Sequence, residues 1–361
     1  MEVKKKIRVL VVDDSAFARR ALQRMLETDS DIEVIGTARN GEQALQLISE
    51  LDPDVITLDI MMPGMDGLAV LRRLMHTHPV PVVLVSSLSR ESVIHSLTAL
   101  ESGAVDIVEK PTSLASDELY QLVGELVAKV KAASRLKGVL RLPRISTRVP
   151  VKRYVSVTTV PSRADVVAIG SSTGGPTALM SLLPQLPADF PAAILIAQHM
   201  PKAFTAPFAE RLNSNCALTV REARDGEKVE PGVVLVAPGD RHMVVQRSSM
   251  GIIVRTTKEP RNAPCVPSVD VLFESVANVY GRRAIGVILS GMGRDGAIGM
   301  RAIKERNGQT IAQDEATSTV FGMPKAAIDM GVVDAVVPIE RIPQELTNRV
   351  YVLPAMDKSK R

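Results

Sequence analysis

Short runs of β-branched residues alternate with amphipathic stretches along most of the chain, and this alternation limits the possible folds more than any other feature. In the first third, five expected strands are each followed by an expected helix. The expected strands are residues 9–12, 33–38, 55–58, 82–86 and 104–109, and the expected helices are residues 16–27, 41–50, 68–76, 93–101 and 116–132. Such alternation predicts a parallel sheet with helices on both faces, in which ligands bind at the carboxyl ends of the strands.

The same alternation returns in the second half of the chain. Further strands are expected at residues 166–170, 193–198, 233–237, 285–290 and 310–312. Between residues 226 and 256 the apolar runs follow one another without a helical spacer, which predicts a short antiparallel portion that interrupts the parallel sheet. The predicted fold class is therefore α/β, with an N-terminal flavodoxin-like domain and a C-terminal doubly wound, mostly parallel α/β domain.

A basic, proline-containing segment separates the two halves. A chain of 361 residues is longer than one hydrophobic core usually grows, so two domains are expected. Residues 135–163 carry many Lys and Arg, three Pro and no acidic residue, as expected for a solvated linker. We therefore predict a first domain at residues 7–128, a basic interdomain linker at 129–163 and a second domain at 164–351.

Cysteine content and hydropathy constrain the compartment. Cys216 and Cys265 are the only cysteines, and their wide spacing indicates neither a disulfide framework nor a zinc site. The basic start at residues 1–6 is followed by an apolar run too short for a signal peptide, and no apolar run reaches the ~20 residues of a membrane helix. We expect a cytoplasmic, monomeric protein without membrane insertion.

Acidic and polar side chains follow the strands of the first domain at one edge of the predicted sheet. Asp13 and Asp14 end the first strand, and Asp59 ends the third. Ser86 ends the fourth strand, and Lys110 follows the fifth. Three carboxylates gathered at one point repel one another unless a divalent cation lies among them, and oxygen ligands suit Mg²⁺. Asp59 is placed centrally, where it could accept a phosphoryl group held by Ser86 and Lys110.

These residues stand in the motifs VVDDS, LDIMMPGMDG, VSS and EKP, and residues 7–128 resemble the response-regulator receiver domain. The resemblance implies phosphorylation at Asp59, phosphoryl contacts from Ser86 and Lys110, and a Mg²⁺ site formed by Asp13, Asp14, Asp59 and the carbonyl of Met61. Ile107 departs from the family pattern, because receivers commonly carry Tyr or Phe three residues before the lysine. The sequence therefore does not predict how phosphorylation is relayed.

A strand at residues 166–169 leads into the sequence GSSTGGP, with Ser172 near its centre. Gly170 to Gly174 fits the pattern G-x-S-x-G, in which a serine is exposed on a tight turn between a strand and a helix. Glycines on either side allow a substrate to approach the backbone, and the N-terminus of the following helix can stabilise an oxyanion. The pattern is short, so a turn of small residues that only caps a helix stays open as the alternative.

Two residues that could complete a catalytic triad follow two other strands. His199 comes directly after the expected strand at 193–198 and could take a proton from Ser172 and return it to a leaving group. Asp295 follows the expected strand at 285–290 and could orient the imidazole. The order Ser–His–Asp differs from that of the α/β-hydrolases with the same serine motif, which predicts a separate family.

The motifs GSSTGGP, QHMP, GMGRDG and FGMP occur in this order, and with the receiver in front they resemble the chemotaxis protein-glutamate methylesterase family, CheB. The resemblance implies hydrolysis of glutamyl methyl esters on methylated chemoreceptors with release of methanol, and deamidation of particular receptor glutamines. It implies Ser172 as nucleophile, His199 as base and acid, Asp295 as orienting carboxylate, and Thr173, Gly174 and Met292 as residues that line the oxyanion site. It also implies a chemotaxis histidine kinase as phosphodonor, and no cofactor for the esterase reaction.

Two other functions fit parts of the sequence. Gly291 to Gly296 matches G-x-G-x-x-G after a strand, which would suit a receiver-regulated dinucleotide-binding oxidoreductase. Asp295 disfavours this interpretation, because its carboxylate would meet the pyrophosphate at the helix N-terminus. The receiver and the basic linker would also suit a phosphorylation-gated DNA-binding regulator, but no helix-turn-helix pattern follows the linker. We therefore expect no nucleic-acid partner.

Overall fold

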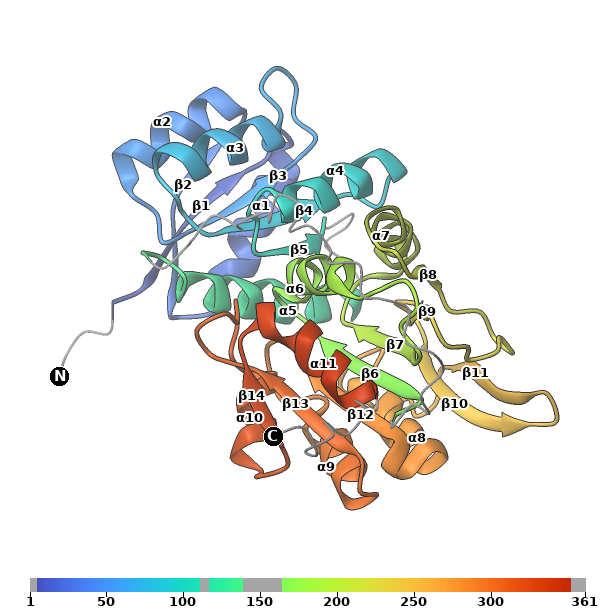
Figure 1. Ribbon diagram of the computed structural model, residues 1–361. Helices are drawn as coiled ribbons and strands as arrows, with labels where there is room; N and C mark the ends of the chain where they lie inside the picture. The colour runs from blue at the N-terminus through green and yellow to red at the C-terminus, as the bar shows by residue number, and fades with distance from the viewer. Residues whose placement is uncertain (1–4, 111–116, 139–163, 352–361) are drawn as a thin grey trace, which may run out of the picture. The chain divides into compact units, whose positions relative to one another are not determined.

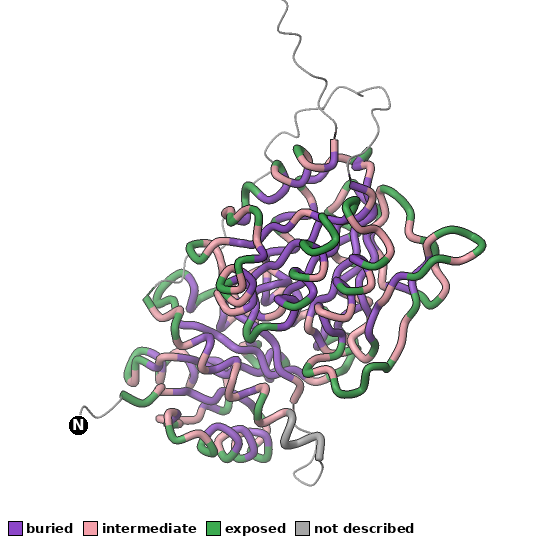
Figure 2. Tube along the Cα trace, turned by 90° about the horizontal axis from the view of Figure 1, so that it is seen from below, coloured by how far each residue is buried: buried purple, intermediate pink, exposed green. Residues whose placement is uncertain are grey.

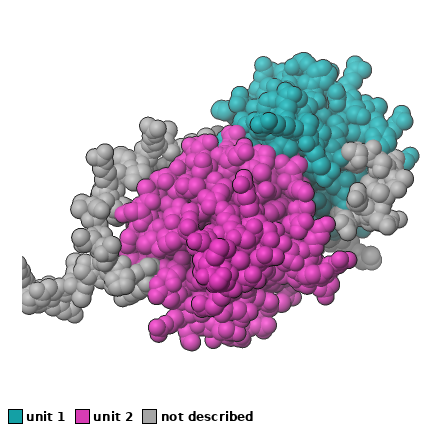
Figure 3. Space-filling view, turned by 90° about the vertical axis from the view of Figure 1, so that its right-hand side faces the viewer, with its two compact units in different colours: residues 1–145 teal, residues 146–361 magenta. Residues whose placement is uncertain are grey.

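The computed structural model describes residues 5–110, 117–138 and 164–351 of the chain (Figure 1). The chain divides into two compact units, Met1–Ile145 and Ser146–Arg361 (Figure 3). Residues 139–163, which make up most of the expected basic linker, lie outside the described residues. Within the described ranges, no helix is both long enough and apolar enough to cross a membrane.

The first unit contains a five-stranded parallel sheet with helices along both faces (Figure 1). Its strands are β1 (Ile7–Val12), β2 (Ile32–Ala38), β3 (Val55–Asp59), β4 (Val82–Ser86) and β5 (Asp106–Glu109), and its helices are α1 (Ala16–Leu26), α2 (Gly41–Leu51), α3 (Gly67–Thr77), α4 (Arg90–Glu101) and α5 (Asp117–Ser134). The strand order β2-β1-β3-β4-β5, with every paired strand parallel, is the flavodoxin-like order. The predicted fold of the first domain is confirmed.

The helices of the first unit begin at polar residues that satisfy free backbone N–H groups. Ser15, Asn40, Asp66 and Ser89 each accept a hydrogen bond from the backbone N–H three residues later. Strands β3 and β4 are buried at every position, because helices cover both faces of a parallel sheet. These two strands are mostly apolar, and the polar cap residues stand between strands and helices. The polar side chains at the sheet therefore gather where the strands end.

Helix α5 extends into the segment expected to be linker. Leu126, Val130 and Ala133 lie on one face of this helix and are completely buried in the core of the first unit. The linker that we expected from residue 129 is therefore helical as far as Ser134, because the apolar spacing of α5 continues beyond the expected boundary.

The second unit contains a seven-stranded parallel sheet and a separate two-stranded hairpin. The strands of the large sheet are β6 (Val166–Ser171), β7 (Ala193–Gln198), β8 (Thr219–Glu222), β9 (Val233–Val236), β12 (Ala284–Ile288), β13 (Gln309–Gln313) and β14 (Ala335–Val337). The helices are α6 (Gly175–Leu182), α7 (Lys202–Asn215), α8 (Val269–Tyr280), α9 (Ala297–Glu305), α10 (Met323–Asp329) and α11 (Ile342–Val350), with short 3-10 turns η1 (Leu183–Gln185), η2 (Gly281–Arg283) and η3 (Ile339–Arg341). The predicted doubly wound, mostly parallel fold is confirmed.

The hairpin of β10 (His242–Ser248) and β11 (Gly251–Thr257) is the antiparallel portion that the sequence predicts. We expected this portion to interrupt the parallel sheet. The structure shows instead that it forms a sheet of its own. Its inner side packs on α8, where Met243 and Val254 join the same core as Leu272, and the backbone N–H of Val245 donates to Ser275 Oγ (3.1 Å). This packing brings the start of α8 and the hairpin together.

The strand order of the large sheet is β14-β13-β12-β6-β7-β9-β8. Strand β6 lies at the topological switch point of this sheet, where the strand order reverses. The chain adds β7 on one side of β6 and later returns to add β12 on the other side. Strands β6, β7 and β12 are buried at every position. Along the chain trace, buried residues lie inside and exposed residues lie outside (Figure 2). Loops that follow β6, β7 and β12 therefore meet at a crevice position typical of binding sites in doubly wound sheets.

Candidate active site

Ser172 follows the central strand β6 and lies between residues that follow β7 and β12. The backbone N–H of Ser172 donates to the carbonyl of Ser290 (3.0 Å), and the backbone N–H of His199 donates to the carbonyl of Ser171 (3.0 Å). Because paired strands lie about 4.8 Å apart, Ser172 and His199 occupy neighbouring positions across two strands. The structure thus brings together two residues that the sequence places on separate strands.

The turn after Ser172 has the tight geometry expected of the serine motif. The carbonyl of Ser172 accepts a hydrogen bond from the backbone N–H of Gly175 (2.8 Å). Gly174 adopts a φ of 76° at the start of α6, where a Cβ atom would lie 2.3 Å from the Cβ of Thr319. Thr173 is buried in this turn, whereas Met292, in the loop after β12, is 39% exposed. No side chain caps the N-terminus of α6, so only backbone N–H groups are presented at this end of the helix.

Gln198 fixes the backbone on both sides of the site. It is the first residue of the QHMP motif, but its position in that motif predicts no role for its side chain. Its Oε1 accepts a hydrogen bond from Ser171 Oγ (2.6 Å), and its Nε2 donates to the carbonyls of Ser172 (3.0 Å) and His199 (2.9 Å). The Gln198 side chain is buried, so these bonds are shielded from water. We therefore assign Gln198 a positioning role for both residues.

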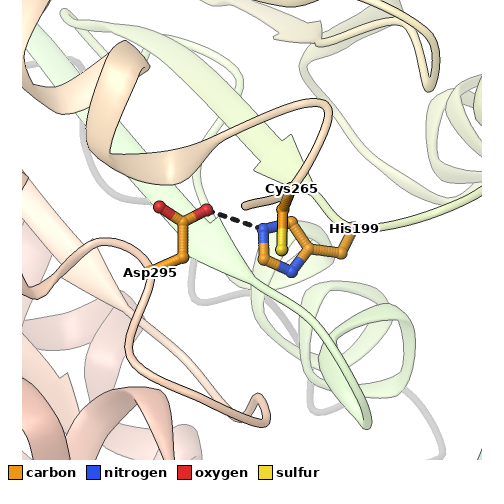
Figure 4. A group of neighbouring side chains, drawn as sticks. All are labelled: His199, Cys265 and Asp295. Carbon is orange, nitrogen blue, oxygen red and sulfur yellow. Dashed lines mark hydrogen bonds and ion pairs between the residues drawn. The ribbon is translucent and has the colours of Figure 1, made fainter. Parts of the chain in front are cut away.

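Asp295 is buried against the N-terminus of α8. Its Oδ1 accepts hydrogen bonds from Ser268 Oγ (3.0 Å) and the backbone N–H of Asp270 (3.0 Å). Its Oδ2 accepts from the backbone N–H of Val269 (2.7 Å) and from His199 Nε2 (2.8 Å) (Figure 4). Burial raises the pKa of Asp295. The hydrogen bond and charge of His199, together with the backbone donors, lower this pKa by more than burial raises it, so the net shift is downward. Asp295 is thus an ionised carboxylate, which the helix dipole also stabilises.

The contact with Asp295 determines how the His199 ring is protonated. Since an ionised carboxylate only accepts hydrogen bonds, Nε2 carries a proton, and Nδ1 is the nitrogen with a lone pair in the neutral ring. Burial alone lowers the pKa of His199, but the hydrogen bond and charge of Asp295, together with the neighbouring Cys265, outweigh burial and raise the pKa to about 9. His199 can therefore accept a proton at Nδ1 and hold it.

Two more side chains lie near the His199–Asp295 pair, and the sequence does not predict that either belongs to the site. Cys265, in the loop between β11 and α8, places its sulfur within 4.8 Å of ligand atoms of His199 and Asp295 (Figure 4). His242, which has no evident partner in the sequence, is buried, and its Nδ1 accepts a hydrogen bond from the backbone N–H of Ser268 (3.0 Å). Hydrogen bonds from the start of α8 to Asp295 and to His242 join segments that are far apart in the sequence, so residue spacing could not reveal them.

The acidic residues of the first unit gather around Lys110. Lys110 Nζ lies 2.9 Å from Asp13 Oδ2 and 2.9 Å from Asp59 Oδ2. Asp13 and Asp59 are buried and Asp14 is exposed, with one carboxylate oxygen of each within 4.8 Å of the others. The backbone N–H of Met61 donates to Asp59 Oδ1 (3.2 Å). The structure thus brings the three predicted carboxylates and the lysine to one edge of the sheet.

This acidic group has the chemistry of a Mg²⁺ site. Burial raises the pKa of both Asp13 and Asp59, and Lys110 only partly offsets that cost of ionisation. A divalent cation among three carboxylates would offset the rest, and hard oxygen donors favour Mg²⁺ over softer metals. The residues present fit the ion, and the group is typical of the Mg²⁺ site of a receiver domain.

Ser86 belongs to a buried cluster of hydroxyl groups. Its Oγ lies 2.8 Å from Ser92 Oγ, and Ser96 Oγ donates to it (2.8 Å), both from α4. Its contact with a phosphoryl group stays a prediction. Ile107 is buried, and its carbonyl accepts a hydrogen bond from Lys129 Nζ of α5 (2.6 Å).

The two folds define a receiver domain followed by a doubly wound α/β domain with the site of an esterase, and comparisons with known proteins agree. Residues 9–123 match the response regulator receiver domain, and residues 167–346 match the family model described as CheB methylesterase. The chain is 48% identical over 366 residues to protein-glutamate methylesterase/protein-glutamine glutaminase 2 of Nitratidesulfovibrio vulgaris, which covers 96% of this chain and 100% of that protein. It is 44% identical over 350 residues to the protein-glutamate methylesterase/protein-glutamine glutaminase of Pyrococcus horikoshii, which covers 97% of this chain and 95% of that protein.

A solved structure gives the same result for the second unit. The crystal structure of the Thermotoga maritima CheB methylesterase catalytic domain is 44% identical, with a TM-score of 0.50, and covers 51% of this chain and 97% of that one. The chain belongs to the CheB methylesterase family, with a receiver domain in front of the methylesterase domain. This membership replaces the oxidoreductase and DNA-binding alternatives.

Proposed function

We propose that this chain hydrolyses glutamyl methyl esters on methylated chemoreceptors and deamidates particular receptor glutamines, with Ser172 as nucleophile. The observation that carries the proposal is the hydrogen bond between the half-buried His199 and the buried Asp295, at the strand end adjacent to Ser172. Relatives that match almost the whole chain are protein-glutamate methylesterase/protein-glutamine glutaminases, which supports this substrate.

In the proposed mechanism, Ser172 Oγ attacks the ester carbonyl while His199 Nδ1 accepts its proton. The oxyanion that forms is stabilised by backbone N–H groups of the turn at Thr173 and Gly174, with Met292 lining the site. Asp295 stabilises the imidazolium, which then protonates methanol as it leaves. Water activated by His199 hydrolyses the glutamyl-enzyme, and a glutamine follows the same path with ammonia as the leaving group.

The proposal is tested by measuring methanol release when the full chain acts on membranes that contain methylated chemoreceptors. A small-molecule phosphodonor and Mg²⁺ are included, so that the receiver is phosphorylated during the assay. Release of methanol from methylated but not from unmethylated receptors is the expected result. Absence of methanol from methylated receptors under these conditions would contradict the proposal.

The rate should depend strongly on pH because the base is protonated at neutral pH. The pKa of His199 is raised to about 9, and only the neutral ring can accept the Ser172 proton. We therefore expect kcat/KM to rise about tenfold per pH unit below pH ~9 and to level off above it. Initial rates of methanol release from pH 6 to 10 measure this profile.

Methyl esters also hydrolyse without enzyme in alkali, so each rate is corrected with the same membranes and the Ser172→Ala chain. A plateau that begins already near pH 7 would show that His199 is not the base with a raised pKa.

The receiver half of the proposal concerns control of this activity. We propose that Asp59 accepts a phosphoryl group from a chemotaxis histidine kinase, that the unphosphorylated receiver restrains the esterase, and that phosphorylation relieves this restraint. Bound Mg²⁺ supplies positive charge that stabilises the added phosphoryl group. The residues proposed to hold the ion are Asp13, Asp14, Asp59 and the Met61 carbonyl, and those proposed to contact the phosphoryl group are Ser86 and Lys110.

Asp59→Asn should abolish the response to phosphodonor, because an amide cannot form the acyl phosphate. Methanol release with and without a small-molecule phosphodonor measures the response. The matched control is Asp52→Asn, an exposed residue in the same unit whose φ of 43° asparagine readily adopts. The control should keep the response of the unchanged chain. An equal response in Asp59→Asn would remove Asp59 from its proposed role.

A further inference from the structure

Three side chains with different ligating atoms meet at the end of β7. The ligand atoms of His199, Cys265 and Asp295 all lie within 4.8 Å of one another, and His199 Nε2 lies 2.8 Å from Asp295 Oδ2 (Figure 4). The sulfur of Cys265 is not needed for the proposed ester hydrolysis. Its position beside a histidine and a carboxylate therefore requires a separate explanation.

We infer that His199, Cys265 and Asp295 form a binding site for Zn²⁺, and that zinc bound there stops ester hydrolysis. A thiolate, an imidazole and a carboxylate are the three ligand types that Zn²⁺ takes in proteins. Such a set does not suit Mg²⁺, which prefers oxygen ligands alone. The site is thus chemically different from the group of Asp13, Asp14 and Asp59 in the first unit.

The distances are close to those of a tetrahedral zinc site with three protein ligands. Zinc bonds of about 2.0–2.3 Å hold the ligand atoms about 3.3–3.6 Å apart. The His199–Asp295 separation of 2.8 Å would open slightly, and the Cys265 sulfur, which lies within 4.8 Å of the other two ligand atoms, would have to move inward by no more than about 1 Å. The fourth position would be open to water, as in other accessible zinc sites.

The surroundings hold the ligands in place. Asp295 keeps hydrogen bonds from Ser268 Oγ and from the backbone N–H groups of Val269 and Asp270, of the kind that orient metal-binding carboxylates. Cys265 stands three residues before Ser268, so the bond between Ser268 and Asp295 also ties the cysteine loop to the site. Because the ligands come from three distant segments, their sequence spacing gives no zinc motif.

Zinc and the proposed catalysis exclude each other. Zinc would displace the proton from the Cys265 thiol and the proton from His199 Nε2, and it would take the Asp295 oxygen that now holds the ring. A metal-bound His199 cannot become the imidazolium that the proposed mechanism needs, so the esterase would be inactive while zinc is bound. This inhibition rests on the proposed function, whereas zinc binding itself does not.

Binding is tested on the full chain with Co²⁺ as a spectroscopic substitute for Zn²⁺. Excess Mg²⁺ is present to occupy the first unit. A charge-transfer band of a cobalt–thiolate bond is expected with the unchanged chain, and added Zn²⁺ should abolish it. Cys265→Ser should lack the band, and Cys216→Ser, the matched control at the other cysteine, should keep it. Absence of the band in the unchanged chain, or an equal band in Cys265→Ser, would overturn the zinc site.

A second measurement avoids any change at Cys265. In Cys216→Ser the only thiol is that of Cys265, and Zn²⁺ should slow its alkylation by iodoacetamide at least tenfold, with a chelator restoring the original rate. Alkylation unaffected by Zn²⁺ would also overturn the site.

Inhibition is measured as methanol release over a range of Zn²⁺ concentrations, with each variant compared with its own rate in chelator. The zinc concentration for half-inhibition should be at least tenfold lower for the unchanged chain and Cys216→Ser than for Cys265→Ser. Equal values would overturn inhibition through this site. If the chain shows the cobalt band but releases no methanol even in chelator, the proposed function fails while the zinc site stands.

Discussion

Ser172→Ala is expected to lower the rate of methanol release from methylated receptors about 10⁶-fold, as the loss of the nucleophile does in comparable triads. The alanine leaves His199 and Asp295 hydrogen bonded but with no oxygen to activate. The backbone bonds of Ser172, to Ser290 and Gly175, do not involve its side chain, so the turn should keep its structure. Methanol release by the phosphorylated full chain measures the loss.

The matched control is Ser181→Ala, a change of the same type at an exposed position of α6. It should leave the rate within about twofold of the unchanged chain, since surface substitutions rarely disturb a fold. Unfolding of each variant by denaturant should show similar midpoints. If Ser172→Ala kept more than about a hundredth of the rate, another residue would have to be the nucleophile, because triad serines contribute far more than that.

The parts of the site that could be predicted are those that follow strands. Parallel strands end at one edge of a sheet, so the positions of Ser172, His199 and Asp295 after three expected strands were enough to predict that they meet. The same argument predicts that Asp13, Asp59 and the other polar residues after strands of the first unit lie close together. The fold was predictable because the buried strands in both units are nearly continuous apolar runs, which stand out in the sequence.

The parts that could not be predicted depend on tertiary packing. Gln198 is a polar residue inside an apolar strand, and only the pairing of β6 with β7 shows that it holds the Ser172 and His199 carbonyls. The start of α8, with Cys265 just before it, reaches the site through hydrogen bonds to Asp295, and no periodicity in the sequence indicates such bonds. Helix α5 continues to Ser134, beyond residue 129 where we expected the linker to start, and the basic segment itself begins at residue 135.

Asp295→Asn is expected to lower the rate of methanol release about 10⁴-fold, less than the loss of the nucleophile, as for the orienting aspartate of comparable triads. The amide of asparagine can present its NH₂ group to His199 Nε2, which would force the proton onto Nδ1. Nδ1 is the nitrogen that must accept the Ser172 proton, so the ring would be held in an unproductive tautomer. The amide also lacks the charge that stabilises the imidazolium.

The same substitution should move the pH profile, which distinguishes loss of orientation from a general loss of structure. Burial lowers the pKa of His199 and Asp295 raises it, so without the carboxylate the pKa should fall below about 9. The residual activity of Asp295→Asn should therefore reach its plateau at a lower pH than that of the unchanged chain. The control Asp329→Asn, an exposed residue of α10, should change neither rate nor profile. A variant with reduced rate but an unshifted profile would show that Asp295 supports the fold rather than the charge of His199.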